Sequence, residues 1–265
     1  ENFKNPAPVV LVFHGGGGPI GTAELMAERS GWVEKAKEEG FLAVFPQGKA
    51  ENPEQPVNVM AEPRDKARNI RDWNEGSLIT SASKKNVDDL SYIDALLDDL
   101  SKKFSIDENR IYATGFSNGA TMSYALGKQR GDRLAAIAPV AGLLYIHDPL
   151  KSAVSLLSIV GANDKAPEPI SFIPKANANS YINNPVEEWG KYLECSGDKM
   201  ENKNGIVIIT KDKCNENAEV VSYRIENMGH VYPGLSFLFD EDPLVGDRVK
   251  AEDVVWNFFE KHSKL

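Results

Sequence analysis

The stretch Gly115-Phe116-Ser117-Asn118-Gly119 decides the fold of this chain. It follows a strand-like run, Arg110 to Thr114, and precedes a helix-like run, Ala120 to Lys128. Where a strand reverses sharply into a helix, the backbone is crowded, and two flanking glycines leave the space that a Cβ would fill. The pentapeptide alone also fits an ordinary turn of small residues. In its strand-to-helix context it predicts a nucleophile elbow that lifts the Ser117 hydroxyl clear of a sheet.

A second motif lies upstream, where the apolar run Val9 to Phe13 stops at His14-Gly15-Gly16-Gly17-Gly18. The run is typical of a buried parallel strand. Four consecutive glycines pack nothing and cost conformational entropy, so the backbone itself must approach another atom closely. A mobile turn and a phosphate-binding loop are the alternatives, but the phosphate-loop ending Gly-Lys-Ser/Thr is missing. We expect an oxyanion hole built from the backbone N–H of Asn118 and that of Gly16 or Gly17.

Two further strand ends carry an acid and a base. Asp164 comes just after the strand-like run Ser155 to Val160, and His230 follows the strand-like run Val220 to Ile225. A carboxylate in that place accepts the imidazole Nδ1–H and leaves Nε2 to take the serine proton. The remaining histidines have plainer explanations, as structural or surface residues: His14, His147 and His262. The order serine, acid, histidine is that of α/β-hydrolases.

With these motifs in place, the chain resembles the esterase family that contains feruloyl esterases of carbohydrate esterase family one and polyhydroxybutyrate depolymerase-like enzymes. The resemblance covers nearly the whole chain. Its elements are the glycine loop, Phe45-Pro46-Gln47-Gly48, Val87-Asp88-Asp89, Arg110 to Ala120, Ala135 to Gly142 and Gly229 to Gly234. It implies a serine esterase of the α/β-hydrolase fold, with Ser117, Asp164 and His230 as catalytic residues and neither cofactor nor metal.

Strand-like and helix-like runs alternate along the chain. Strands are expected at 9–13, 41–45, 110–114, 135–140, 155–160, 205–210 and 220–225, and helices at 32–39, 88–104, 120–128, 186–193 and 251–262. This alternation predicts a doubly wound, mainly parallel sheet with helices on both faces and its site at the carboxyl ends of the strands. With 265 residues, 42% of them hydrophobic, we expect one α/β-hydrolase catalytic domain over residues 1–265.

Charge and hydropathy exclude several partners. The net charge is −9 and no basic stripe is present, which argues against nucleic acid or an anionic membrane surface as a partner. No apolar run approaches the roughly 18 residues of a membrane span. A solvated helix face with a dipole-matched start is expected to account for most of the acidic residues Asp88, Asp89, Asp94, Asp98 and Asp99, instead of a metal site. Charge and composition do not specify the oligomeric state.

The chain has two cysteines, Cys195 and Cys214, which follow a helix-like and a strand-like run. The resemblance implies a disulfide between them, because related esterases carry one in this region. A disulfide in turn favours a secreted or periplasmic protein whose signal peptide has been removed. The alternative is a pair of free buried thiols in a cytosolic enzyme.

Two long loops, 47–80 and 162–184, are expected to shape the substrate site. In the first, Trp73 matches a tryptophan segment of the resembled family, and an indole offers an apolar wall with one donor. The alternative is that Trp73 anchors the loop on the core. Tyr232 has the same two interpretations, and His14 is the third candidate for substrate contact.

Only the resemblance to the esterase family limits the range of expected substrates. It favours feruloyl esters of plant cell-wall polysaccharide, so the expected partner is a small-molecule ester or an esterified polysaccharide. A short-chain polyhydroxyalkanoate depolymerase and an acetyl esterase are the close alternatives, and a prolyl-type peptidase is a remoter one. A non-catalytic carbohydrate-binding relative is expected to have lost at least one triad residue, whereas all three are present.

Overall fold

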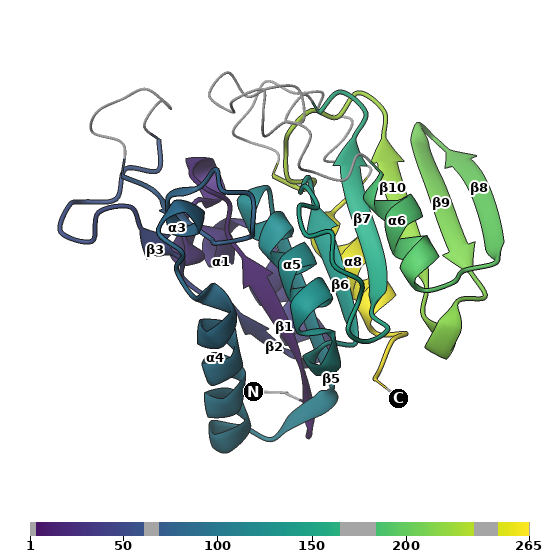
Figure 1. The fold of residues 1–265 in the computed structure, drawn as a ribbon, viewed down its shortest axis with the longest axis horizontal. Coiled ribbons are helices and arrows are strands. Elements are labelled where there is room, and N and C mark those ends of the chain that lie inside the picture. The colour runs from purple at the N-terminus through teal and green to yellow at the C-terminus, as the bar shows by residue number, and fades with distance from the viewer. Residues whose placement is uncertain (1–3, 61–68, 165–183, 236–248, 265) are drawn as a thin grey trace.

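The computed structural model describes residues 4–60, 69–164, 184–235 and 249–264. Its main sheet consists of β1 (Ala7–Phe13), β2 (Leu42–Val44), β5 (Ile106–Phe116), β6 (Ala136–Val140), β7 (Ser155–Gly161), β8 (Gly197–Lys203), β9 (Ile206–Asp212) and β10 (Val220–Ile225). The strand order is β2-β1-β5-β6-β7-β10-β9-β8 (Figure 1). The first six strands in this order are mutually parallel, β9 is antiparallel to β10, and β8 is antiparallel to β9. The predicted mainly parallel sheet is confirmed.

Helices cover both faces of the sheet (Figure 1). One face carries α1 (Ala23–Arg29), α2 (Trp32–Glu39) and α8 (Ala251–Phe259), and the other carries α4 (Asp89–Lys103), α5 (Asn118–Gln129) and α6 (Pro185–Tyr192). The alternation of side chains along β1 explains this arrangement, since Val10 and Val12 pack in the first core while Val9, Leu11 and Phe13 pack in the second. A strand apolar on both faces must be covered on both, which is the doubly wound fold that the sequence predicts.

The remaining elements are short. A two-stranded ribbon of β3 (Lys49–Ala50) and β4 (Arg71–Asp72) fastens the ends of the first long loop, and α3 (Ser81–Lys84) follows it. Three 3₁₀ turns complete the described elements, at Gly18–Ile20, Gly131–Arg133 and Asn215–Asn217.

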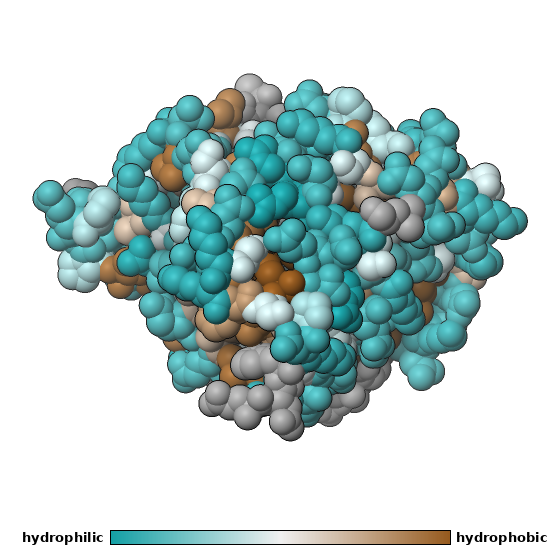
Figure 2. Space-filling view, turned by 90° about the horizontal axis from the view of Figure 1, so that it is seen from below, coloured by the Kyte–Doolittle hydropathy of each residue, from teal (hydrophilic) through white to brown (hydrophobic). Residues whose placement is uncertain are grey.

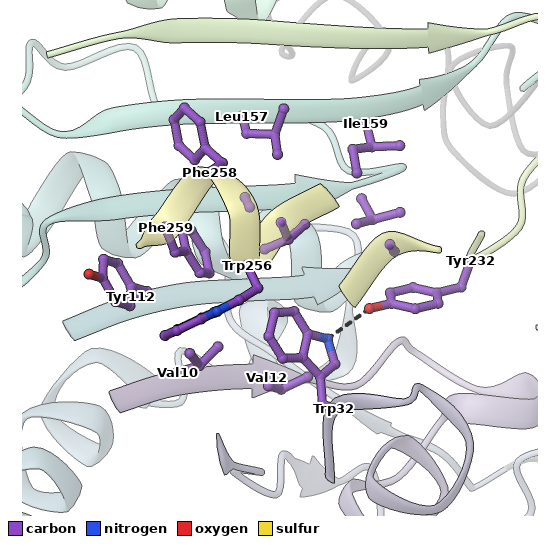
Figure 3. Close-up of a cluster of buried hydrophobic side chains, with 14 of the residues drawn as sticks. Val10, Val12, Trp32, Tyr112, Leu157, Ile159, Tyr232, Trp256, Phe258 and Phe259 are labelled. Atoms are coloured by element: carbon purple, nitrogen blue, oxygen red, sulfur yellow. Dashed lines mark hydrogen bonds between the residues drawn. The ribbon is translucent and has the colours of Figure 1, made fainter. Parts of the chain in front are cut away.

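The first core centres on stacked aromatic rings (Figure 3). Tyr112 of β5 stacks on Phe259 with ring centroids 4.6 Å apart, and Phe41 stacks on Trp256 at 4.2 Å. At the end of this core nearest the strand carboxyl ends, the indole N–H of Trp32 donates to the Tyr232 hydroxyl at 2.8 Å. Buried tryptophan and tyrosine stay in an apolar core when their polar atoms pair in this way.

Cys195 and Cys214 form a disulfide. Cys195 lies just before β8 and Cys214 just after β9, so the bridge closes the β8–β9 hairpin at the end opposite its turn. Strand β8 of this hairpin is the edge of the sheet, where pairing on one side only leaves a strand least constrained. The bridge therefore supports the part of the sheet with the fewest neighbours.

The face at the amino ends of the parallel strands is covered mostly by hydrophilic residues, with apolar residues visible in a small hollow (Figure 2). Within the described ranges, we find no helix with the length and apolar character of a membrane span.

Candidate active site

The elbow is formed where β5 passes directly into α5 through Ser117. Ser117 has φ 52° and ψ −116°, a strained backbone conformation for a residue with a side chain. A Cβ on Gly115 would lie 2.7 Å from the Phe13 carbonyl oxygen, and one on Gly119 would lie 2.4 Å from the same oxygen. Both glycines are therefore needed for the elbow to sit against the end of β1, and the strained turn presents the Ser117 hydroxyl at the carboxyl edge of the sheet.

Three side chains form a hydrogen-bonded chain at this edge. His230 Nε2 lies 2.9 Å from Ser117 Oγ, and His230 Nδ1 lies 3.0 Å from Asp164 Oδ2. An ionised carboxylate only accepts, so Nδ1 donates to Asp164 and Nε2 is left to accept the Ser117 O–H. The Asp164 side chain is 10% exposed and that of His230 is 36% exposed. The arrangement thus has a shielded acid and a base that solvent and substrate reach.

A close approach between two loops brings the acid and the base together. Gly161 ends β7, and a Cβ there would lie 2.2 Å from the carbonyl oxygen of Met228, two residues before His230. The Ala162 N–H donates to Ile225 at 2.8 Å, and the Asn163 N–H donates to Met228 at 2.9 Å. The segment that carries Asp164 is therefore fastened to the segment that carries His230 by backbone contacts.

The glycine loop lies beside the elbow. A Cβ on Gly16 would be 3.6 Å from Asn118 Cβ, whereas one on Gly17 would face the Val59 carbonyl oxygen at 3.4 Å. The Gly15 N–H is used within the loop, since it donates to Ile20 at 3.0 Å. Among the residues that the structure describes, the N–H groups of Gly16 and Asn118 donate to no protein acceptor. Of the two glycines that the sequence left open, the geometry favours Gly16.

The three residues that the sequence offers as candidates for substrate contact, Trp73, Tyr232 and His14, are buried in the structure. This burial corrects their interpretation as substrate contacts. Trp73 and His14 have no exposed surface, and Tyr232 is 2% exposed. A side chain without exposed surface offers a substrate nothing to contact. The alternative given for Trp73, that it anchors its loop on the core, agrees with the structure, and Tyr232 is held in the core by its bond from Trp32.

His14 supports the start of the glycine loop as a neutral imidazole. Its Nε2 accepts the Gly48 N–H at 3.0 Å, so the hydrogen is on Nδ1, which donates to the Gly15 carbonyl at 2.7 Å. Burial lowers the pKa of His14 to about 4. The protonated, cationic form of His14 is therefore disfavoured, and the neutral ring connects the glycine loop to the loop that contains Gly48 through its two hydrogen bonds.

The structure also reveals three buried carboxylates around Trp73, those of Asp72, Glu75 and Asp89. Asp72 caps α3 by accepting the N–H groups of its first two residues, at 2.7 and 2.9 Å, and Asp89 accepts the Asn74 N–H at 2.7 Å. Burial raises the pKa of Asp89 to about 6 and that of Glu75 to about 7. Asp89 is 4% exposed, so it does not share the solvated face that is predicted for most of the acidic residues of α4. A usable signal existed, because Asp89 precedes the buried Ile93 and Leu97 at intervals of four, one helix face.

Two further observations concern the surroundings of the site. In the described part of the chain, no group of three or more His, Cys, Asp or Glu side chains is placed to hold a metal. Of the two loops expected to shape the substrate site, residues 61–68 and 165–183 lie outside the described residues.

A parallel sheet with a strained serine elbow and a Ser117–His230–Asp164 chain, in the sequence order serine, acid, histidine, defines an α/β-hydrolase. Residues 1–165 match the phospholipase/carboxylesterase family, and the chain belongs to that family. The predicted resemblance to esterases is confirmed.

The chain is similar to several curated esterases. It is 27% identical over 175 residues to feruloyl esterase C of Emericella nidulans, covering 66% of this chain and 58% of that protein. It is 22% identical over 165 residues to the bifunctional acetylxylan esterase/xylanase XynS20E of Neocallimastix patriciarum, covering 62% and 20%. It is 28% identical over 152 residues to poly(3-hydroxyalkanoate) depolymerase C of Paucimonas lemoignei, covering 57% and 30%. The chain therefore spans less than two thirds of each of these relatives.

Two solved structures share the fold over almost the full length. An acetyl xylan esterase from Aspergillus awamori superposes with a TM-score of 0.58 at 12% identity, covering 98% of this chain and 91% of that one. Esterase PE8 superposes with a TM-score of 0.53 at 16% identity, covering 97% and 93%. At such identities the likeness establishes the fold alone.

Proposed function

We propose that this protein is a serine carboxylesterase that hydrolyses ester bonds through an acyl-enzyme on Ser117. The observation that carries the proposal is the position of His230, which is within hydrogen-bond distance of both Ser117 Oγ and Asp164 Oδ2. A serine hydroxyl is a weak nucleophile on its own and needs an adjacent base that is oriented by a third group.

In the proposed reaction, Ser117 Oγ attacks the ester carbonyl carbon while His230 Nε2 takes the hydroxyl proton. The resulting oxyanion is held by the N–H groups of Asn118 and Gly16. The imidazolium, stabilised by Asp164, protonates the leaving alcohol, and the acyl group stays on Ser117. Water, deprotonated by His230, then attacks the acyl-enzyme, and collapse of the second intermediate releases the acid and restores the serine. Loss of one oxyanion donor is expected to cost about 100- to 1,000-fold in kcat.

For the substrate, we propose feruloyl esters of plant cell-wall polysaccharide. The similarity to a protein named feruloyl esterase C and to one named acetylxylan esterase/xylanase supports an acyl group carried on a polysaccharide. The similarity to a depolymerase of poly(3-hydroxyalkanoate) keeps a polyester as the second candidate.

We further propose that residues 1–265 act as one catalytic domain outside the cytosol. Ser117 follows β5 and His230 follows β10, and both strands belong to one sheet. The disulfide between Cys195 and Cys214 supports an oxidising compartment, as does a substrate in the cell wall.

The test is a substrate comparison of the wild type with the Ser117→Ala variant, on methyl ferulate, p-nitrophenyl acetate and a hydroxybutyrate oligomer. Ser123→Ala is the matched control, because this buried hydroxyl of the same helix donates only to the Gly119 carbonyl among the described residues. We expect ferulate cleavage that is lost in Ser117→Ala and kept in Ser123→Ala. Cleavage of the acetate or the oligomer alone would replace the feruloyl ester by another substrate class and leave the mechanism standing. Turnover that survives in Ser117→Ala would contradict the mechanism.

A further inference from the structure

We propose that Trp73 is a positioning residue that fixes the two halves of the oxyanion hole relative to one another. The inference rests on the proposed function, since it concerns the N–H groups assigned there to the oxyanion. It gives a specific role to a buried side chain that, in the described part of the chain, makes no hydrogen bond or ring contact with Ser117 or His230.

Trp73 makes one hydrogen bond to each half of the hole. Its backbone N–H donates to Asn118 Oδ1 at 2.8 Å, on the residue that supplies the elbow donor. Its indole N–H donates to the His14 carbonyl at 3.0 Å, in the peptide that opens the glycine loop. One residue thus connects two segments that are 104 positions apart in the sequence from His14 to Asn118.

The bond to His14 helps to hold the backbone from which the Gly16 N–H extends. The His14 carbonyl and the Gly15 N–H belong to one planar peptide, and both are engaged, the carbonyl by Trp73 and the N–H by Ile20. The next peptide, which carries the Gly16 N–H, is held through the Gly15 carbonyl, which accepts the His14 Nδ1–H at 2.7 Å. With both peptides engaged, the Gly16 N–H has little freedom to turn. A preorganised donor stabilises a developing oxyanion without a cost of reorientation during the reaction.

Trp73 is itself immobilised. Its ring packs edge-on against Phe13 at a centroid distance of 5.1 Å and at a tilt against His14 at 5.0 Å. Its carbonyl accepts the Thr80 hydroxyl at 2.8 Å. The backbone on either side is held as well, by the carboxylates of Asp72 and Asp89. The carboxylates of Asp72 and Asp89 therefore help to keep Trp73 stationary.

A purely structural role is the competing explanation, and the chain offers a matched residue to test it. Trp189 is equally buried, lies in the same core and donates its indole N–H to the Val154 carbonyl at 2.8 Å. Val154 precedes β7 at its amino end, away from the elbow. Loss of either indole hydrogen bond should lower the free energy of unfolding by a similar amount. A difference in kcat between the two variants therefore reports the effect of placing the tryptophan beside the oxyanion hole.

The experiment compares Trp73→Phe with Trp189→Phe by thermal unfolding and by kcat and KM on p-nitrophenyl acetate, with inhibition by an aryl trifluoromethyl ketone as a probe of the oxyanion. We expect both variants to lose similar thermal stability. Only Trp73→Phe should lose kcat, on the order of tenfold, with KM within about twofold and a parallel rise in Ki of the ketone. Equal kcat losses in both variants, or unchanged kcat in Trp73→Phe, would overturn the proposal.

A second variant decides the matter if Trp73→Phe does not fold. Asn118→Ala removes the acceptor of the Trp73 N–H but keeps the Asn118 backbone donor, and it should also lower kcat with little change in KM. Wild-type kcat in Asn118→Ala would overturn the proposal. Failure of the proposed function is separately visible: it would appear as wild-type turnover that persists in Ser117→Ala, and the positioning role would fall with it.

Discussion

Gly161→Ala should separate the catalytic base from the nucleophile without touching either. The added Cβ would lie 2.2 Å from the Met228 carbonyl oxygen, where ordinary contact begins at 3.4 Å, so that carbonyl must retreat by about 1.2 Å. His230 follows two residues later, and a shift of that size would lengthen its 2.9 Å contact with Ser117 Oγ beyond hydrogen-bond range. A displacement of about 1 Å in a catalytic group costs on the order of 100-fold in rate.

The assay is kcat/KM on p-nitrophenyl acetate together with thermal unfolding, with Gly127→Ala as the control. A Cβ on Gly127 would lie 2.9 Å from Ile137 Cδ1 and 3.0 Å from Trp189, a clash between α5 and the core. Both variants should lose about 1–3 kcal/mol of stability from overpacking. Only Gly161→Ala should lose activity at a temperature where both are folded. A folded Gly161→Ala variant with wild-type kcat/KM would refute the reasoning.

Three other predictions concern stability. Burial raises the pKa of Glu75 from 4.5 to about 7. Between these pH values the folded state holds a proton that the unfolded state releases, so the stability of the wild type falls as pH rises. Glu75→Gln does not titrate, and in urea unfolding its free energy of unfolding should gain about 3 kcal/mol relative to the wild type between pH 4.5 and 7.5; a difference that does not change with pH would be inconsistent with this. Replacing both Cys195 and Cys214 by serine should lower the free energy of unfolding by about 3 kcal/mol, because the lost bridge spans 19 positions, and should leave kcat unchanged. Equal stability of the variant and the wild type in guanidinium without reductant would count against this prediction. Tyr232→Phe should lower the free energy of unfolding by about 1–3 kcal/mol, because it leaves the Trp32 N–H unpaired, and should leave KM unchanged. A raised KM would instead support the interpretation of Tyr232 as a substrate contact.

The sequence predicted the sheet and the site geometry where backbone sterics leave few choices. The strands that carry Ser117, Asp164 and His230 read as apolar runs that stop at glycine or at a polar turn, and parallel strands bring their carboxyl ends to one edge. The glycines Gly115 and Gly119 are required by the close approach of β5, α5 and β1. A pattern that arises from such a constraint can be recognised without any coordinates.

Elements and side chains that depend on their tertiary neighbours were missed. Strand β8 has the sequence Gly-Asp-Lys-Met-Glu-Asn-Lys and is exposed along nearly its whole length, so it has no apolar alternation to detect and pairs only because β9 lies beside it. Helix α1 has seven residues and begins at a Thr22 cap, too short for a clear period.

The positions of Trp73 and Tyr232 show a second limit of the sequence. An aromatic residue next to a catalytic strand end fits a pocket wall and a core plug equally well, since both surroundings are apolar with one hydrogen-bond partner. Only the hydrogen-bond partners distinguish the two: the His14 carbonyl, which accepts from Trp73, and the Trp32 indole N–H, which donates to Tyr232.

Labelling with a fluorophosphonate, followed by intact mass measurement and peptide mapping, tests most directly whether Ser117 is the nucleophile. We predict one adduct per chain, on Ser117, and a labelling rate at least about 100-fold lower in His230→Ala, because the base that activates the hydroxyl is gone. An adduct on another residue, or ester turnover by a protein whose Ser117 remains unlabelled, would contradict it.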